Sequence, residues 1–417
     1  MTPEVRDRID QLRHGNVPEG YKKTRSGIVP IDWTEMCLGD IYTERKEPGN
    51  ENLPLLMVSI HSGVSDGEVD EDDLPKKVKR IEDKSQYKRA AKGDLVFNMM
   101  RAWQGAIGTV RTEGMVSPAY IVAEPNDMVD PLFMDYYMKT NRMVQTIHRQ
   151  SYGVTDFRLR LYWDSFAPIQ CVLPSVKEQK KIAEILTTQD KIIELKEKLL
   201  EEKQKQKKYL MQQLLTGKKR LSGFEGKWKK EKLSDFCEFI GGGTPDTKKP
   251  EYWAGDTPWI SSSDLELDSF SSIAITRFIS DAAIVESATK KVKAGTILLV
   301  SRVGVGKIAL APVDLCTSQD FTNIVQDKHN ATYLMYALYL LMQIKGNQAQ
   351  GSAIKGIPVK EIKAYSLDMP PIDEQNAIAM VLSTFDKEID LLCRSLENEK
   401  QKKKALMQLL LMGIVRV

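Results

Sequence analysis

A long internal repeat constrains the fold of this chain more than any other feature of its sequence. Residues 174–221 align without a gap on residues 370–417, at a constant offset of 196 positions, and 22 of the 48 aligned positions are identical. Because a gapless match of this length does not arise by chance, the chain contains two diverged copies of one structural unit. We therefore expect two halves of similar layout.

Both copies of the repeat are predicted to be long helices. Pro174 and Pro370 lie just upstream of the predicted helix starts, Gly217 and Gly413 lie where the helices would end, and neither proline nor glycine lies at 175–216 or 372–412. Apolar residues recur at steps of four and three, as in the seam of a coiled coil. A lone helix of this kind favours homodimerisation, but two matched copies in one chain can pack against each other. We therefore expect an intramolecular antiparallel coiled coil that acts as a fixed spacer.

The segments between the helices also correspond to each other, although more loosely. GDLVFNMMR at 93–101 resembles GTILLVSR at 295–302. Short apolar runs, turns rich in Gly, Asp and Pro, and predicted helices at 131–150 and 331–345 indicate mixed α+β domains. The fold class we expect is thus α+β, with two pseudo-symmetric globular domains separated by the two helices.

The N-terminus carries a third, shorter copy of the pattern. The stretch from Gln11 to Trp33 resembles the stretch from Gln213 to Trp228, with a QL pair, a glycine, a KK pair and an SG pair in the same order. The chain thus begins with the end of one helix copy, which predicts a circular pseudo-dimer whose termini meet. A short amphipathic arm with a chance similarity is the alternative.

These observations define five segments. They are an N-terminal arm that closes the circle (1–30), the first globular domain (31–173), the first helical spacer (174–221), the second globular domain (222–369) and the second helical spacer (370–417).

The composition limits the class of protein. No run of about 18 apolar residues is present, so no membrane span is expected, and Met1–Gly20 lacks the apolar core of a signal peptide. The five cysteines are far apart and form no CxxC pair, which is typical of reduced thiols in the cytoplasm. The net charge of +3 does not by itself indicate a nucleic-acid partner. Any electrostatic footprint for a charged partner must therefore be local.

The order of domain, helix, domain and helix resembles that of the specificity subunits of type I restriction–modification systems. The resemblance is carried by the P-x-x-x-E-Q helix starts at 174–179 and 370–375, by the LMQ-x-LL-x-G helix ends, and by the glycine-led GDL…R and GTI…R motifs of the two domains. It extends over essentially the whole chain. It implies two target-recognition domains, each reading one half of a split double-stranded DNA sequence.

The resemblance also implies partners. The two helices would set the distance between the half-sites and dock two modification (methyltransferase) subunits, and restriction (translocase/endonuclease) subunits would then join the complex. S-adenosylmethionine, ATP and Mg²⁺ are expected on those partner subunits, and no cofactor is expected on this chain.

Candidate DNA contacts are polar and basic residues in loops, because such side chains read base edges and bind phosphates. Arg101 and Arg302 are the strongest pair, since each ends a strand-like run and opens a glycine-containing loop; surface salt bridges are the alternative for both. The basic run at 76–92 is a candidate phosphate contact or, alternatively, a solvated face. The complete set of candidates is Ser59, His61, Lys76, Lys77, Lys79, Arg80, Arg101, Gln104, Ser117, Tyr120, Ser151, Thr155, Arg158, Ser261, Ser263, Arg302, Lys307, Ser318, Gln319, Gln350, Ser352 and Lys355.

No motif of a catalytic site is found. Neither an N-P-P-[FY] tetrapeptide nor an F-x-G-x-G loop is present, and GVGK at 304–307 lacks the first glycine and the hydroxyl residue of a phosphate-binding loop. Four scattered histidines make a zinc site improbable. We expect no catalytic and no metal-ligating residues. The alternatives are an enzyme with an unrecognised site and a two-headed coiled-coil adaptor that binds protein or glycan; the adaptor would show no salt-dependent affinity for DNA.

Overall fold

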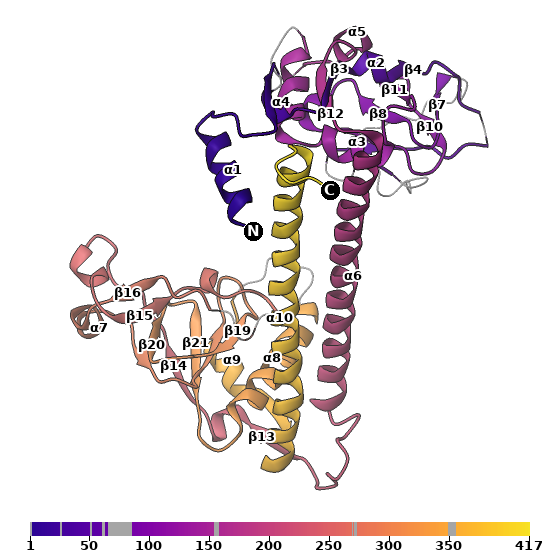
Figure 1. Cartoon of the computed structure of the whole chain (residues 1–417). Helices are drawn as coiled ribbons and strands as arrows, with labels where there is room; N and C mark the ends of the chain where they lie inside the picture. Colours follow the sequence, from indigo (N-terminus) through magenta and orange to yellow (C-terminus); the bar gives the residue numbers. More distant parts are fainter. Residues whose placement is uncertain are drawn as a thin grey trace. The chain divides into compact units, whose positions relative to one another are not determined.

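The computed structural model divides the chain into two compact units (Figure 1). Unit 1 comprises Met1–Leu195 and Glu397–Val417, and unit 2 comprises Lys196–Leu396. The residues that the structure describes are 2–25, 27–50, 52–60, 63–65, 86–153, 158–268, 270, 273–348 and 356–417. Both long helices, α6 (Val176–Leu214) and α10 (Ile372–Leu411), contribute one part to each unit. In the described part of the chain, no helix has the length and apolar character needed to span a membrane.

A four-stranded antiparallel sheet forms the centre of the globular part of unit 1. The strand order is β4 (Tyr42–Glu44), β11 (Tyr120–Pro125), β8 (Leu95–Asn98) and β9 (Ile107–Thr109). Successive residues of β8 point to opposite faces, as the pleat of a strand requires. Leu95 and Phe97 pack in the core that includes α3 (Pro131–Met138) and α4 (Asn141–Gln150), whereas Val96 packs in a second core.

The globular part of unit 2 repeats this sheet. The strand order is β14 (Glu238–Gly241), β21 (Phe321–Val325), β18 (Ile297–Val300) and β19 (Ile308–Leu310). Ile297 and Leu299 pack in the core that includes α8 (Ala331–Gln348), and Leu298 packs in the opposite one. The predicted strands in the GDL and GTI motifs are therefore confirmed, as are the helices near 131–150 and 331–345, the first of which is broken between α3 and α4.

Smaller elements complete each unit. In unit 1 they are α1 (Pro3–Arg13), β1 (Tyr21–Thr24), β2 (Gly27–Pro30), β3 (Thr34–Cys37), α2 (Leu38–Ile41), β5 (Val58–Ser59), β6 (Gly63–Val64), β7 (Lys88–Ala90), β10 (Gly114–Val116), α5 (Trp163–Phe166) and β12 (Gln170–Leu173). In unit 2 they are β13 (Lys229–Lys232), β15 (Thr257–Ile260), β16 (Arg277–Ile279), α7 (Asp281–Glu286), β17 (Lys291–Val292), β20 (Leu315–Thr317), α9 (Val359–Ala364) and β22 (Ser366–Met369).

A two-stranded antiparallel ribbon joins the beginning of each globular domain to its end. In unit 1, β3 pairs with β12, and in unit 2, β13 pairs with β22. The last strand of each ribbon runs into the proline that precedes a long helix. Each domain is thereby closed at the point where its helix begins.

The glutamine of each P-x-x-x-E-Q motif ties a long helix to its own domain. The side-chain oxygen of Gln179 accepts the N–H of Asp130 (2.8 Å), the residue that caps α3. Its amide nitrogen donates to the carbonyl of Pro174 (2.9 Å). Gln375 repeats both bonds in unit 2, with Asn330 (3.0 Å) and Pro370 (2.8 Å). In both buried glutamines, the oxygen and the nitrogen of the side-chain amide thus have hydrogen-bond partners within the chain.

The glutamate of the same motif forms an ion pair with the end of the other helix copy. In unit 1 the buried Glu178 carboxylate pairs with Arg416 (2.6 Å), and in unit 2 the buried Glu374 carboxylate pairs with Arg220 (2.6 Å). Arg220 and Arg416 occupy the same position of the repeat. The start of each long helix therefore meets the segment that follows the end of the other long helix, which is the reciprocal contact that antiparallel packing requires.

In unit 2, residues later in α6 pair with residues earlier in α10. The ammonium of Lys196 donates to Ser395 (2.7 Å), and that of Lys203 contacts Glu388 (2.7 Å). In unit 1, the amide of Gln189 donates to Glu399 (2.7 Å). The expected antiparallel pairing of the two helices is confirmed.

Each unit also contains a cluster of one lysine, one aspartate and one tyrosine. In unit 2, Lys207 contacts Asp386, which also accepts the hydroxyl of Tyr336. The pair is largely buried, and this burial raises the pKa of Asp386 and lowers the pKa of Lys207. Unit 1 repeats the cluster at the equivalent repeat positions, where Asp190 binds Lys403 (2.5 Å) and the Tyr136 hydroxyl (2.6 Å).

The N-terminal arm meets the C-terminal end of the chain in unit 1. Arg8 donates to the carbonyl of Ile414 (2.5 Å), and the Tyr21 hydroxyl donates to the carbonyl of Gly413 (2.6 Å). The glycines that end α1, α6 and α10 are all left-handed, with φ of 76° at Gly15, 66° at Gly217 and 68° at Gly413. The third copy of the pattern thus ends its helix as the other two do, and the circular arrangement is confirmed.

Replacement of Lys207 by alanine is expected to destabilise the chain by about 3 kcal/mol, because the buried Asp386 carboxylate loses its counter-charge. Lys403→Ala should cost less, since its pair with Asp190 is 28% and 38% exposed against 8% and 14% for Lys207 and Asp386. Urea unfolding of the intact chain measures both losses. Lys208→Ala, at an exposed neighbouring position, is the control and should be neutral; equal losses for Lys207→Ala and Lys403→Ala would contradict the assignment.

Candidate nucleic-acid interface

The loop that follows β8 in unit 1 brings three separate segments together. It carries Arg101 and Gln104, and both residues are exposed. The N–H of Met99 donates to the carbonyl of Ala119 (3.1 Å), and the N–H of Leu161 donates to the carbonyl of Met99 (2.9 Å). The loop therefore lies between the turn that precedes β11 and the segment that precedes α5.

The loop that follows β18 in unit 2 is held by the same hydrogen bonds. The N–H of Ser301 donates to the carbonyl of Asp320 (2.9 Å), and the N–H of Ile357 donates to the carbonyl of Ser301 (2.7 Å). This loop carries Arg302 and Lys307. The segments around 99, 119 and 161 in one domain, and around 301, 320 and 357 in the other, thus form one recurring arrangement.

Arg101 and Arg302 belong to the loops and not to the strands. The strands end at Asn98 and Val300, so the prediction that both arginines end a strand is corrected. Both arginines are exposed, and neither guanidinium forms an ion pair or hydrogen bond with any residue that the structure describes. The salt-bridge alternative therefore finds no partner in the described parts of the chain. An exposed, unpaired guanidinium presents all of its donors to a ligand.

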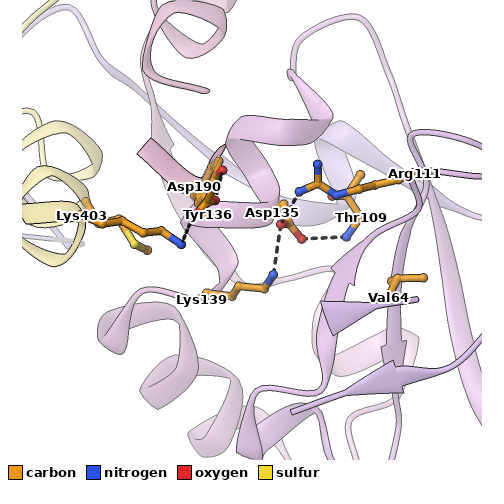
Figure 2. A pocket seen from close by; sticks show the side chains of 9 residues that line it. Val64, Thr109, Arg111, Asp135, Tyr136, Lys139, Asp190 and Lys403 are labelled. Atoms are coloured by element: carbon orange, nitrogen blue, oxygen red, sulfur yellow. Dashed lines mark hydrogen bonds and ion pairs between the residues drawn. The ribbon is translucent and has the colours of Figure 1, made fainter. Parts of the chain in front are cut away.

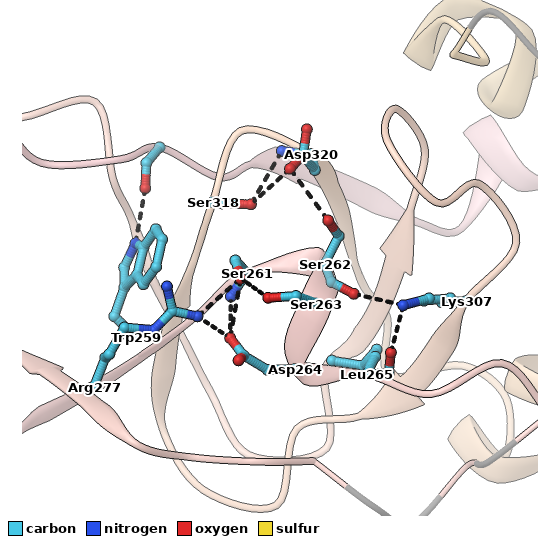
Figure 3. Close-up of polar contacts among 11 residues, drawn as sticks. Trp259, Ser261, Ser262, Ser263, Asp264, Leu265, Arg277, Lys307, Ser318 and Asp320 are labelled. Carbon is cyan, nitrogen blue, oxygen red and sulfur yellow. Dashed lines mark hydrogen bonds and ion pairs between the residues drawn. The ribbon is translucent and has the colours of Figure 1, made fainter. Parts of the chain in front are cut away.

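A polar cluster in unit 2 fixes the turn after β15 (Figure 3). The Arg277 guanidinium lies over the Trp259 ring, 4.6 Å from its centroid, and donates to Ser261 (2.8 Å) and to Asp264. The indole N–H of Trp259 donates to the carbonyl of Gly243 (2.9 Å). Because its orientation is set by these contacts while 38% of its side chain remains exposed, Arg277 is a preorganised donor.

No motif or repeat match in the sequence points to Arg277. It lies in β16, a strand without a recognised match in the first half, and its position beside Ser261 follows from strand pairing between β15 and β16. Of its neighbours in this cluster, only Ser261 and Ser263 are among the candidates that the sequence indicates.

Three of the candidate residues have structural roles that differ from the prediction. Ser151 is buried and its hydroxyl donates to the carbonyl of Ile147 (2.8 Å) at the end of α4. Ser318 is buried, with its hydroxyl 3.3 Å from a carboxylate oxygen of Asp320. The Lys307 ammonium donates to the carbonyls of Ser262 (2.9 Å) and Leu265 (2.6 Å). These groups form hydrogen bonds within the chain that position the loops; Ser151 and Ser318 are buried, and Lys307 is partly exposed.

The other described candidates remain in loops or at strand ends. Ser261 and Ser263 bond to each other through their hydroxyls (2.8 Å), and Gln319 accepts the hydroxyl of Thr244. Exposed candidates are Gln104, Arg158, Ser263 and Gln319, and partly exposed ones are Ser59, Ser117, Tyr120 and Ser261. The remaining candidates, His61, Lys76, Lys77, Lys79, Arg80, Thr155, Gln350, Ser352 and Lys355, lie outside the described residues.

A cavity of about 230 Å³ in unit 1 lies beside the cluster of Asp190, Lys403 and Tyr136 (Figure 2). On its other side, Asp135 accepts the N–H of Thr109 (2.9 Å) and the ammonium of Lys139 (3.0 Å). Its carboxylate groups are thus neutralised within the chain.

Unit 2 places an aromatic ring beside the equivalent cluster. Phe270 packs against Tyr336 (5.0 Å between ring centroids), and the Lys207 ammonium lies 4.1 Å from the centroid of the Phe270 ring. The cavity in unit 1 therefore reflects a difference in packing beside the lysine, aspartate and tyrosine cluster of each unit. The residues that line the cavity form no recognisable catalytic constellation.

The described residues include no group of three His, Cys, Asp or Glu side chains arranged to hold a metal ion. All five cysteines are free thiols. Burial raises the pKa of Cys171 and of Cys237 to about 12, so both thiols stay protonated at neutral pH.

Comparison with known families identifies the two halves as copies of one domain. The family model for the type I restriction modification DNA specificity domain matches residues 30–205 and again residues 225–400. Since these two matches cover most of the chain, the chain belongs to this family, and its two globular parts are DNA specificity domains.

Curated relatives agree with this membership. The chain is 34% identical over 185 residues to the type I restriction enzyme MjaIX specificity subunit of Methanocaldococcus jannaschii, a match that covers 43% of this chain and 41% of that protein. It is 24% identical over 434 residues to the putative type I restriction enzyme MjaX specificity subunit of the same organism, covering 96% of this chain and 97% of that protein.

Solved structures share the fold. A type I restriction–modification S subunit from M. genitalium matches with a TM-score of 0.59 and 12% identity, covering 91% of this chain and 96% of that one. A chain from a study of complex assembly and conformational transition of the type I R-M system matches with a TM-score of 0.56 and 17% identity, covering 93% and 99%. At these identities the likeness concerns the fold alone.

Arg101→Ala and Arg302→Ala are each expected to weaken binding to cognate DNA by roughly ten- to a hundredfold, because one arginine contact to a base edge contributes about 1–3 kcal/mol. Fluorescence anisotropy with duplex DNA at fixed salt measures the effect. Each substitution should abolish discrimination in one half of the target only.

The matched controls are Lys92→Ala and Lys293→Ala. Each lysine is exposed and lies before the strand that its arginine follows, at the opposite end of β8 or β18. The assignment of the arginine loops would be wrong if the controls weakened binding as much as the arginine substitutions.

Proposed function

We propose that this chain is the DNA-reading subunit of a type I restriction–modification complex and that each globular domain reads one half of a bipartite target. The observation that carries the proposal is the loop with an unpaired arginine, built once in each domain and held by the same two backbone hydrogen bonds. The side chains around the two loops differ. Two readers with one scaffold and different surfaces suit a target whose halves have different sequences.

The helices, in this proposal, set the spacing between the half-sites and dock two modification subunits, to which restriction subunits are added. Support comes from the repeat, because two equivalent surfaces in one chain suit two copies of one partner. The first helix copy carries 13 Lys or Arg against 7 Asp or Glu, and the second carries 7 of each. The excess charge of the first copy fits either nearby DNA or an acidic partner surface.

The chemistry of the complex is assigned to the partner subunits. This chain would contribute sequence recognition without catalysis, and S-adenosylmethionine, ATP and Mg²⁺ would bind elsewhere in the complex. Because its ligand is the DNA of the cell, we place its action in the cytoplasm.

Methylation mapping tests the proposal directly. The chain is co-expressed with the modification subunit encoded beside it, and the host genome is sequenced for N6-methyladenine. We expect a split motif, with two short defined halves around a fixed gap and one methylated adenine in each half. A stable complex that methylates no defined motif would refute the proposed function.

Exchange of residues 31–173 for the corresponding domain of another specificity subunit should change one half of the methylated motif and leave the other half intact. The reason is that the recognition loops of each domain are held by contacts within that domain. The same mapping measures the outcome. A motif altered in both halves would contradict independent reading by the two domains.

Insertion of one heptad into each helix, after Lys198 and after Leu392, should lengthen the gap by about three base pairs, because seven helical residues span about 10.5 Å and base pairs repeat every 3.4 Å. Both helices must be extended together to keep their cross-helix pairs in register. An insertion in α6 alone is the control and should destabilise the chain. New bases in either half-site would show that the helices do more than set the spacing.

A further inference from the structure

The Arg277 side chain is held in a fixed position while part of its hydrogen-bonding capacity stays open (Figure 3). Its Cζ atom lies 4.6 Å from the centroid of the Trp259 ring, and its Nη2 atom donates to Ser261 (2.8 Å) and to Asp264. Among the described residues, none accepts a hydrogen bond from its Nε or Nη1 atom. Because a guanidinium carries five N–H donors in one plane, donors of fixed direction remain for a ligand.

The turn after β15, which Arg277 contacts, also contacts the loop that carries Arg302. The hydroxyl of Ser262 in this turn donates to the carboxylate of Asp320 (3.4 Å), and the carbonyl of Asp320 accepts the N–H of Arg302 (3.3 Å). The Lys307 ammonium of the same loop donates to the carbonyl of Ser262 (2.9 Å). Figure 3 shows the turn between Arg277 and Lys307. Arg277 therefore belongs to the same surface of the domain as the arginine loop.

The charges around Arg277 favour a neutral acceptor over a phosphate group. The carboxylate of Asp264, which is only 12% exposed, forms an ion pair with the guanidinium. The carboxylate of Asp320 lies at the other side of the same turn. Phosphate binding is driven by uncompensated positive charge, and these two carboxylates oppose it. The edge of a base, by contrast, offers neutral acceptors that a compensated guanidinium can still bind.

Guanine matches this donor group better than the other bases do. Its major-groove edge carries two acceptors, O6 and N7, and an arginine that binds both makes the commonest base-specific contact. Adenine presents one acceptor beside a donor, thymine presents one acceptor beside a methyl group, and cytosine presents a donor. A guanidinium that is already fixed by a ring and a carboxylate also loses less freedom on binding than a mobile side chain.

We propose that Arg277 reads a guanine in the half of the target that the second globular domain recognises. This inference rests on the proposed function and adds a specificity-determining residue to it. Trp259 and Asp264 are positioning residues, because the ring fixes the plane of the guanidinium and the carboxylate fixes its rotation within that plane. The half-site of the second domain therefore contains at least one G·C base pair.

Methylation mapping of variants in complex with the modification subunit tests this assignment. Exchange of residues 31–173 first identifies the half of the motif that the second domain reads, and this half should contain a G·C base pair. Arg277→Ala should make that single position degenerate and leave the other half of the motif unchanged. It should also weaken binding to cognate duplex DNA roughly ten- to a hundredfold. A second half-site composed only of A·T pairs would refute the assignment.

Arg277→Met separates base reading from a purely structural role. Methionine keeps an unbranched apolar side chain beside Trp259 and removes every N–H donor. This variant should unfold at a temperature similar to that of the wild-type chain and should relax the same single position as Arg277→Ala. A residue that only braced the turn would instead relax several positions or none, and either result would overturn the proposal.

The salt dependence of binding separates a base contact from a phosphate contact. Loss of one phosphate contact would reduce the slope of log K against log salt concentration by about 0.9. We expect Arg277→Ala and Arg277→Met to keep the wild-type slope, because the contact that they remove is to a neutral base edge. A reduced slope with an unchanged methylated motif would show that Arg277 binds phosphate and would refute the assignment to guanine.

Lys291→Ala is the matched control. Lys291 is exposed on β17, which lies at the opposite edge of the sheet that begins with β16. The substitution removes one positive charge from the same sheet and should change neither the motif nor the affinity. The assignment would be wrong if Lys291→Ala relaxed the same position as Arg277→Ala. A wild-type complex that methylates no defined motif would instead refute the proposed function, and the role of Arg277 with it.

Discussion

The reciprocal pairing of the two helix copies is the constraint on which the rest of this structure depends. In each unit an aspartate of one copy accepts a tyrosine hydroxyl from its own globular domain and contacts a lysine from the other copy. The same carboxylate therefore sets both the register of the helices and the attachment of the domain. A shift of one helix along the other would leave these charges without partners, and unpaired charge is costly where it is removed from water.

The repeated P-x-x-x-E-Q motif at each helix start serves the same purpose. Its glutamine accepts the N–H of Asp130, which caps α3, or of Asn330, whose side chain accepts the N–H of Tyr333 in the first turn of α8. Its glutamate pairs with an arginine from beyond the end of the other helix. The identical residues of the repeat thus divide into two groups, those that assemble the chain and those that face outward.

The recognition loops, unlike the helices, share their backbone contacts but not their side chains. Their backbone is fixed by hydrogen bonds that recur in both domains, while their side chains have diverged. Such a division suits a protein that must read different sequences with one fold, because backbone contacts hold the loop and leave its side chains to specify the ligand. The modest net charge of the chain is compatible with this role, since a few positioned arginines supply base readout without a strongly basic surface.

The repeat predicted the long helices, their antiparallel pairing and the meeting of the termini, and the short apolar runs, turns and helical segments predicted the two α+β domains, because periodicity and internal identity are properties of the sequence itself. It also pointed to Arg101 and Arg302 through their matched motifs. Only the tertiary structure decided which polar residues are free to meet a ligand: Ser151 and Ser318 are buried, Lys307 holds a turn, and Arg277 is brought beside Ser261 by strand pairing. The physical reason is that burial and hydrogen-bond partners depend on contacts between residues far apart in sequence, whereas helix formation and internal repetition are encoded locally.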